Sequence, residues 1–197
     1  VFALVRRAEQ GRLLAEFERR ADVPASALQR DIDDHVYLLR SIDAFFFSSQ
    51  DVDRMEFWGF TKDALTRLRG LVALEWAPRV TEAGRDSHER KVKAEGFADY
   101  QILDRDDNGR SVRSPIRAEY LPIAYVEPRT ELSELGLDLA ATVDYVNAMV
   151  RARAGGVPTA SQPFQRASGT NRTWSYRVFA PVYTNLVAHE SLVDRHR

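Results

Sequence analysis

The first 48 residues carry one uninterrupted helical pattern, and no other feature constrains the fold as strongly. Apolar or small side chains recur at steps of three or four residues, close to the 3.5-residue period of a coiled-coil seam. A helix of this length would extend about 70 Å, well beyond an ordinary globular helix, so we expect a stalk that connects two parts of a protein. The stripe consists of Leu14, Phe17, Ala21, Ala25, Leu28, Ile32, His35, Leu39, Ile42 and Phe46.

Two residues are unusual in this pattern, although neither breaks its register. Pro24 lies off the stripe, and a proline inside a helix costs about 3 kcal/mol, so the sequence predicts a kink near residues 20–24 rather than two separate helices. His35 is the polar member of the stripe, and we interpret it as a partly exposed seam histidine rather than a buried pH switch.

The pattern beyond the stalk predicts an α+β fold with antiparallel sheets. Asp53 and Glu56 have the spacing of a capping box, and Val52 with Phe57 that of a hydrophobic staple, which begins a helix that Gly70 ends. Further helices are expected over residues 81–95 and 143–154, the second stopped by Gly155-Gly156. The expected strands are 71–80, 100–103 and 116–126, the last two joined across Asp107-Asn108-Gly109, and then 160–166, 174–182 and 186–192.

Composition excludes several classes of function. The net charge is −1, so no global field attracts nucleic acid or anionic lipid, and the absence of cysteine excludes disulfides, thiolate metal sites and a cysteine nucleophile. No apolar run approaches the roughly 18 to 20 residues needed to cross a bilayer, and no signal peptide is evident. These observations fit either a cytoplasmic protein or a soluble piece of a membrane protein.

No motif for catalysis or metal binding is present, and we predict no catalytic residue, no cofactor and no metal. Asp104, Asp106, Asn108 and Gly109 imitate the start of a calcium loop, but Pro115 stands where its bidentate glutamate belongs. None of the histidines are spaced as ligands on one helix face; they are His35, His88, His189 and His196.

Short motifs spread over almost the whole chain occur in an order that matches one known family. The most recognisable is LVALEWAPRV at residues 71–80, and the second is YLPIAYVEP at residues 120–128. The others are residues 39–46 followed by Glu56-Phe57, Gly96-Phe97 before a strand, LGLDL at 135–139, Arg151-Ala152-Arg153 before Gly155, and Pro181-Val182-Tyr183. Together these motifs resemble the CHASE sensor domain.

The resemblance implies a long N-terminal stalk helix followed by two PAS-like antiparallel-sheet subdomains. We expect the stalk at residues 1–50, a membrane-distal ligand-binding subdomain at 51–166, and strands completing a membrane-proximal subdomain at 167–197. Such a domain is the periplasmic or extracellular part of a membrane protein, lies between transmembrane helices, and passes ligand occupancy to a histidine kinase or a nucleotide cyclase. It has no catalytic activity of its own.

The resemblance also guides the expected ligand site. Plant relatives bind cytokinins through an acidic side chain, where this chain has Ala118, so the expected ligand is a small organic molecule other than a cytokinin. Trp76 is either a wall of the site or core packing, and Arg79, near Glu75, is either a structural ion pair or a ligand clamp. The full set of candidate ligand-binding residues is Trp76, Arg79, Ala118, Glu119, Tyr120, Tyr125, Ser161 and Phe164.

Two other hypotheses of function remain as alternatives to a sensor. One is an enzyme with a carboxylate or histidine base, and the other is a protein-binding or structural module. The apolar stripe of the stalk predicts a homodimer, in which only the N-terminal half of the stalk is intermolecular. Nucleic acid is not an expected partner.

Overall fold

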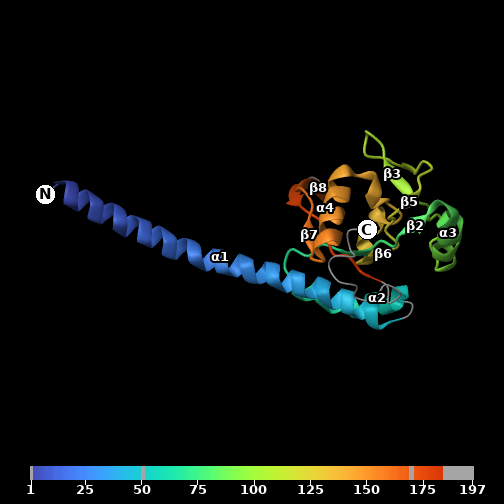
Figure 1. Cartoon of the computed structure of the whole chain (residues 1–197), viewed down its shortest axis with the longest axis horizontal. Helices are drawn as coiled ribbons and strands as arrows, with labels where there is room; N and C mark the ends of the chain where they lie inside the picture. The colour runs from blue at the N-terminus through green and yellow to red at the C-terminus, as the bar shows by residue number, and fades with distance from the viewer. Residues whose placement is uncertain (1, 50–51, 169–170, 184–197) are drawn as a thin grey trace. The chain divides into compact units, whose positions relative to one another are not determined.

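The structure is a computed structural model that describes residues 2–49, 52–168 and 171–183. The chain divides into two compact units, Val1–Leu38 and Leu39–Arg197. The first contains most of the long helix, and the second contains the end of that helix with every other element (Figure 1).

Helix α1 runs from Phe2 to Ser48 and is helical at every residue, including Pro24. This confirms the expected single stalk helix and excludes a hairpin of two helices that turns back at the proline. His35 is half-buried, and its Nδ1 contacts the carbonyl of Asp31. In the described part of the chain, no helix is both long enough and apolar enough to cross a membrane.

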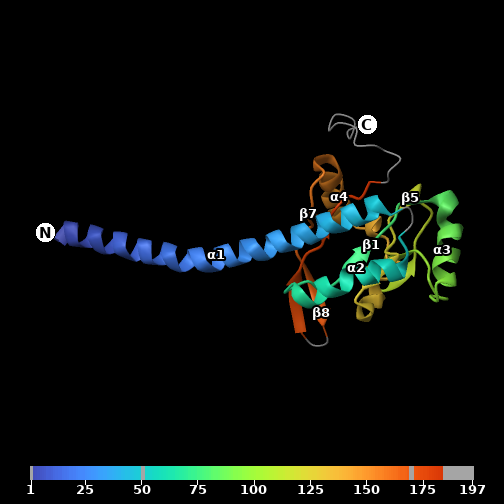
Figure 2. The same cartoon turned by 90° about the horizontal axis from the view of Figure 1, so that it is seen from below.

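Helix α2 (Arg54–Arg67) begins at the expected capping box. The Asp53 side chain accepts from the Glu56 amide at 2.8 Å, and the Glu56 side chain accepts from the Asp53 amide at 3.0 Å. Phe60 of α2 stacks on Phe45 of α1 at 4.6 Å, so α2 packs alongside the end of the stalk helix (Figure 2). Gly70 follows α2 with a φ of 76°, a conformation that favours glycine.

The expected strand over residues 71–80 is wrong as a single element. It divides into β1 (Leu74–Trp76) and β2 (Val80–Thr81), which pair antiparallel with β6 (Tyr125–Glu127) and β5 (Glu119–Tyr120). The expected strand over 116–126 divides in the same way between β5 and β6. Pro78 and Pro122 lie in the two interruptions, and a proline has no amide hydrogen to continue a ladder.

The segment between β2 and β5 holds a helix and a hairpin. A 3₁₀ turn, η1 (Glu82–Gly84), is capped by Thr81 and leads into α3 (Arg85–Ala94), near the expected helix. The hairpin joins β3 (Leu103–Arg105) to β4 (Ser111–Arg113), so the expected turn is confirmed but its flanking strands are shifted. The shift arises because the Asp106 side chain accepts from the amides of Asn108 and Arg110, which fixes the turn at residues 106–110.

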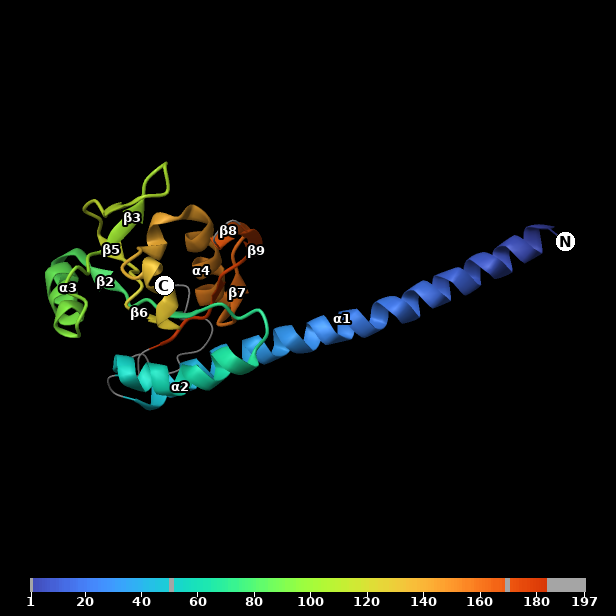
Figure 3. The same ribbon diagram turned by 180° about the vertical axis from the view of Figure 1, so that it is seen from behind.

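The last described third of the chain contains η2 (Arg129–Glu134), η3 (Leu139–Ala141) and α4 (Val143–Gly155). Helix α4 ends as expected, at Gly156 in the left-handed conformation. The expected strands over 160–166 and 174–182 form two antiparallel pairs, β7 (Thr159–Ala160) with β10 (Val178–Phe179) and β8 (Phe164–Ser168) with β9 (Asn171–Ser175) (Figure 3). The expected strand over 186–192 lies outside the described residues.

The described chain is therefore α+β, with an N-terminal helix and small antiparallel sheets, as expected. The buried side chains of the described residues include two groups that pack together. Val80, Ile102 and Tyr120 form one beside α3. The other lies between the β1–β6 pair and α4 and contains Ile123, Val126, Leu137 and Leu139.

Candidate functional site

The β1–β6 pair presents two faces to two different parts of the molecule. Trp76 lies opposite Tyr125 in the register, and Glu75 lies opposite Val126. Because successive side chains of a strand point to opposite faces, Trp76 and Tyr125 share one face, and Glu75 and Val126 share the other.

The face of Trp76 and Tyr125 packs against the helices. The Trp76 ring stacks on Phe46 of α1, with centroids 4.0 Å apart, and Tyr125 packs against Phe57 of α2 at 5.7 Å. The Tyr125 hydroxyl donates to the carbonyl of Val52 at 3.1 Å. Of these two expected site residues, Trp76 therefore connects the sheet to the end of the stalk helix, and Tyr125 connects it to α2 and the segment before it.

The opposite face meets a cluster around one arginine, which we call the Arg177 cluster: Arg177, Glu75, Glu134, Tyr145 and Phe164. The Arg177 guanidinium donates to both oxygens of Glu75 at 3.1 and 3.3 Å, to Glu134 at 3.1 Å and to the Tyr145 hydroxyl at 2.7 Å. It also lies over the rings of Tyr145 and Phe164, 5.0 and 5.7 Å from their centroids. Residues up to 102 positions apart in sequence meet here.

The electrostatics of this cluster favour a permanently charged arginine. Burial alone would lower the pKa of Arg177, but the nearby Glu75 carboxylate, with Tyr145 and Glu134, raises that pKa above its usual value. The side chains of Arg177 and Glu75 keep 17% of their surface exposed and that of Glu134 keeps 24%, so solvent reaches the cluster.

Two expected site residues belong to this region. Ser161 is buried, and its hydroxyl accepts from the Arg177 amide at 3.1 Å and donates to the Gln162 carbonyl at 2.8 Å. Phe164 is half-buried and meets the Tyr145 ring edge-on at 6.2 Å. Tyr145 also packs on the second core group, and so do other partly buried apolar side chains: Ala73, Ala77, Leu121, Leu135, Met149 and Phe179.

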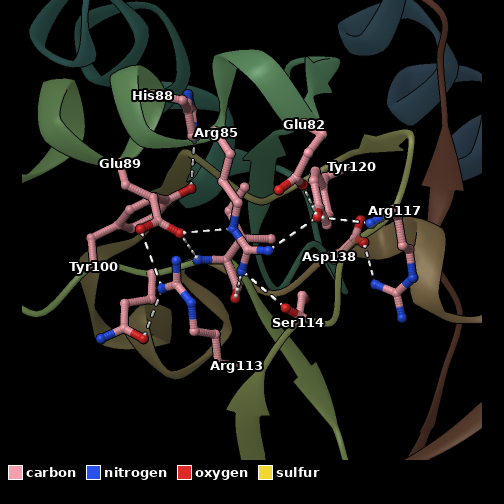
Figure 4. Close-up of polar contacts among 12 residues, drawn as sticks. Glu82, Arg85, His88, Glu89, Tyr100, Arg113, Ser114, Arg117, Tyr120 and Asp138 are labelled. Carbon is pink, nitrogen blue, oxygen red and sulfur yellow. Dashed lines mark hydrogen bonds and ion pairs between the residues drawn. The ribbon is translucent and has the colours of Figure 1, made fainter.

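Tyr120 has a different role, at the centre of a separate polar network (Figure 4). Its buried hydroxyl accepts from Arg85 at 3.0 Å and from the Arg117 amide at 2.9 Å, and it contacts Glu82 and the Pro115 carbonyl. Arg85 is itself buried and donates to Glu89 and to the carbonyls of Ile102 and Ser114. All hydrogen-bonding capacity of the Tyr120 hydroxyl is thus used within the chain, which makes Tyr120 part of the framework.

We therefore expect Tyr120→Phe to lower the free energy of unfolding by about 2–3 kcal/mol, because the Arg85 and Arg117 donors stay buried without their acceptor. Chemical denaturation followed by circular dichroism measures this difference. Tyr176→Phe, at a hydroxyl on a side chain that is 59% exposed, should change it by less than about 0.5 kcal/mol. Equal effects of the two changes would contradict the framework role.

The other three expected site residues lie at the surface. Arg79 pairs with Glu119 at 2.6 Å, and their side chains are 71% and 50% exposed. Arg79 therefore does form an ion pair, but its partner is Glu119 rather than the nearby Glu75, which binds Arg177. Ala118 is exposed beside this pair. The structure thus does not bring Arg79, Ala118 and Glu119 together with Ser161 and Phe164.

We expect one histidine of the network in Figure 4 to make the stability of the fold depend on pH. Burial lowers the pKa of His88, although the carboxylates of Glu89 and Glu95 oppose this and Lys91 adds to it. His88 contacts the Tyr100 hydroxyl at 2.9 Å. Because the unfolded chain takes up this proton first, the stability that neutral His88 provides is present above about pH 6.5 and is lost as the pH falls toward the folded-state pKa.

We accordingly expect the free energy of unfolding to decline as the pH falls below about 7, and His88→Gln to flatten this part of the profile. Denaturant titrations at closely spaced pH values measure it. His35→Gln, on the stalk, is the matched control and should retain the decline. A profile that His88→Gln leaves unchanged would contradict this assignment.

Sequence reasoning missed most of the Arg177 cluster. Arg177, Glu134 and Tyr145 carried no motif, and Glu75 was noted only as a neighbour of Arg79. A motif of closely spaced residues could not have indicated them, because they lie far apart in the sequence, on β1, η2, α4 and the segment before β10. Within the described residues, no three His, Cys, Asp or Glu side chains are grouped to hold a metal ion. Chemically, the cluster offers paired charges and aromatic rings, which suit the recognition of a ligand.

The chain matches a known protein family. The model of the CHASE domain matches residues 50–197, which is well over half of the chain. No curated protein matches the chain.

Proposed function

We propose that this chain, which belongs to the CHASE domain family, detects a small organic molecule on behalf of a membrane-bound histidine kinase or diguanylate cyclase. CHASE domains are extracytoplasmic sensor modules of signalling receptors and are not catalytic. Flanking transmembrane helices and an output domain in the full-length receptor are part of this proposal. So are the two PAS-like subdomains, whose expected boundary at residues 166 and 167 stays a prediction.

The Arg177 cluster is the site that we propose for the ligand. This proposal rests on the observation that one short sheet, the β1–β6 pair, contacts this cluster on one face and the stalk helix on the other. Glu75 of β1 binds Arg177 on one face, and the next residue, Trp76, stacks on Phe46 of α1 on the other. A ligand on the first face is therefore separated from the stalk helix by the thickness of one sheet.

Signalling follows if the ligand binds one arrangement of this sheet better than another. A ligand shifts an equilibrium only by its difference in affinity for the two states. The interface of Trp76 and Tyr125 with α1 and α2 is made of aromatic side chains in close contact. Packed interfaces of this kind shift between discrete arrangements rather than deforming continuously, which suits transmission to the stalk.

The ligand experiment uses two aromatic residues of the β8–β9 hairpin. Phe164 contacts Tyr145 and Arg177, whereas Trp174 is 71% exposed and lies opposite Gln165 in the register, on the other face. In a thermal-shift screen with a library of metabolites, we expect compounds that stabilise the wild type and Trp174→Ala but not Phe164→Ala. Compounds that stabilise Phe164→Ala equally would place the site elsewhere, and a library without any binder would favour a protein-binding module.

We also propose that the stalk helix pairs with a second copy of the chain. The stripe changes character along α1: Ile42 is buried by the chain itself, whereas Phe17, Leu28 and Ile32 are 69%, 61% and 41% exposed. A row of large apolar side chains at coiled-coil spacing is stable when a second helix covers it.

Analytical ultracentrifugation should therefore show a concentration-dependent dimer that Leu28→Lys abolishes, since a lysine at a seam position places charge in the interface. Val23→Lys is the matched control, because Val23 is 72% exposed but lies off the stripe, and this variant should still dimerise. A strict monomer at every concentration, or equal effects of the two lysines, would contradict the proposed interface.

A further inference from the structure

We propose that the ligand of the Arg177 cluster is a small organic cation, such as a protonated amine, with an apolar body. This inference rests on the proposed ligand site and adds the chemical class of its occupant. It follows from counting which hydrogen-bonding groups of the cluster are used and which are spare.

The donors of the cluster are almost exhausted. A guanidinium has five N–H groups, and the contacts of Arg177 with Glu75, Glu134 and Tyr145 use four of them. The fifth N–H group and the hydrogen of the Tyr145 hydroxyl are the donors that these contacts leave spare. The Arg177 amide is used as well, because it donates to Ser161, and the Ser161 hydroxyl donates to the carbonyl of Gln162. A ligand that brings only acceptors would find few partners here.

The acceptors, in contrast, are plentiful. Each carboxylate has about four lone-pair sites. The Glu75 oxygens accept one bond each from Arg177, and the Glu134 oxygens accept one from Arg177 and one from Arg105 at 3.5 Å. About half of the acceptor capacity is therefore spare, which suits a ligand that carries N–H donors.

Charge and ring chemistry agree with this count. Glu75 and Glu134 carry two negative charges against the single positive charge of Arg177. The Arg105 side chain at the rim is 37% exposed, so solvent screens its charge more strongly than that of the 17% exposed Arg177. An anion would join two carboxylates, whereas a cation would be attracted to them. The rings of Tyr145 and Phe164, over which Arg177 already lies, offer apolar surface for the body of the ligand. Phe179, whose ring lies 5.6 Å from that of Tyr145, would extend this apolar surface.

The test compares compounds of one skeleton that differ only in charge. Phenethylamine, phenylpropionate and phenylethanol form one such set, and butylamine, pentanoate and butanol form another. In calorimetric titrations of the wild-type chain, we expect the amine of at least one set to bind at least tenfold more tightly than its carboxylate. Glu134→Gln keeps the shape of the side chain and should weaken the amine about tenfold or more, as expected for a lost charge-assisted hydrogen bond. Glu119→Gln, at an exposed carboxylate bound to Arg79, should not.

Three results would overturn this assignment: carboxylates that bind as tightly as the amines, amines that do not bind, and an amine affinity that Glu134→Gln leaves unchanged. None of them by itself removes the proposed function. The proposed function would still stand if other compounds stabilise the wild type and do not stabilise Phe164→Ala. The proposed function would be contradicted if every compound that stabilises the wild type, whatever its charge, stabilises Phe164→Ala equally.

Discussion

Replacing Arg177 by methionine should lower the free energy of unfolding by about 3 kcal/mol. The change removes the guanidinium that neutralises Glu75 and Glu134 and leaves two carboxylates close together at mostly buried positions, which is the costly way to break such a pair. It also frees the segment before β10 from β1. Equilibrium denaturation in urea measures the loss.

Two control variants show whether the loss has this cause. Arg79→Met removes an arginine whose pair with Glu119 is exposed, and exposed pairs contribute at most about 1 kcal/mol. The double variant Arg177→Met with Glu75→Leu removes both charges of that ion pair and leaves Glu134 without a second carboxylate beside it. We expect it to recover at least half of the loss, because apolar replacement of a whole pair is often nearly neutral. A double variant less stable than the single one would contradict the electrostatic explanation.

The Trp76→Ala variant should uncouple ligand binding from the stalk. Trp76 does not contact Arg177; it stacks on Phe46 of α1, so its loss should change ligand affinity by less than about threefold. In the wild type we expect the bound ligand to change the dimerisation constant by about fivefold or more, the lower end of ordinary allosteric coupling. In Trp76→Ala this change should vanish, because the contact between the sheet and α1 is lost.

The measurement is the sedimentation dimerisation constant with and without the tightest-binding compound. Trp58→Ala is the matched control, since Trp58 is on the exposed side of α2, where Lys62 lies over its ring at 4.7 Å, and it should retain the coupling. Coupling that persists in Trp76→Ala would show that the signal reaches the stalk by another route.

The parts of the fold that were predictable are those with local signals. The single helix α1 follows from an apolar stripe of constant period, and α2 follows from a capping box between Asp53 and Glu56. The end of α4 follows from Gly156, which adopts the left-handed conformation. Each of these depends on residues a few positions apart, so the sequence contains the information in readable form.

The strands were harder, because their extent depends on partners distant in sequence. The apolar pattern of residues 71–80 predicts one strand. In the structure the ladder is interrupted at Pro78, and β1 pairs with β6 whereas β2 pairs with β5. The same reason limits the prediction of the site. Ser161 and Phe164 were expected, and both meet Arg177, but nothing near Arg177 in the chain indicates that it binds Glu75. The family motifs indicated the position of the sheet, but they did not indicate that Arg177 binds it through Glu75.

The central claim is that a ligand at the Arg177 cluster moves the end of the stalk helix, and a distance measurement tests it directly. The chain has no cysteine, so Arg40→Cys and Arg153→Cys, both at exposed positions on α1 and α4, give specific sites for a pair of spin labels. We predict that the tightest-binding compound shifts the distance distribution between them in the wild-type background and leaves it unchanged in Phe164→Ala. A compound that binds through the Arg177 cluster without any shift in that distance would contradict the account.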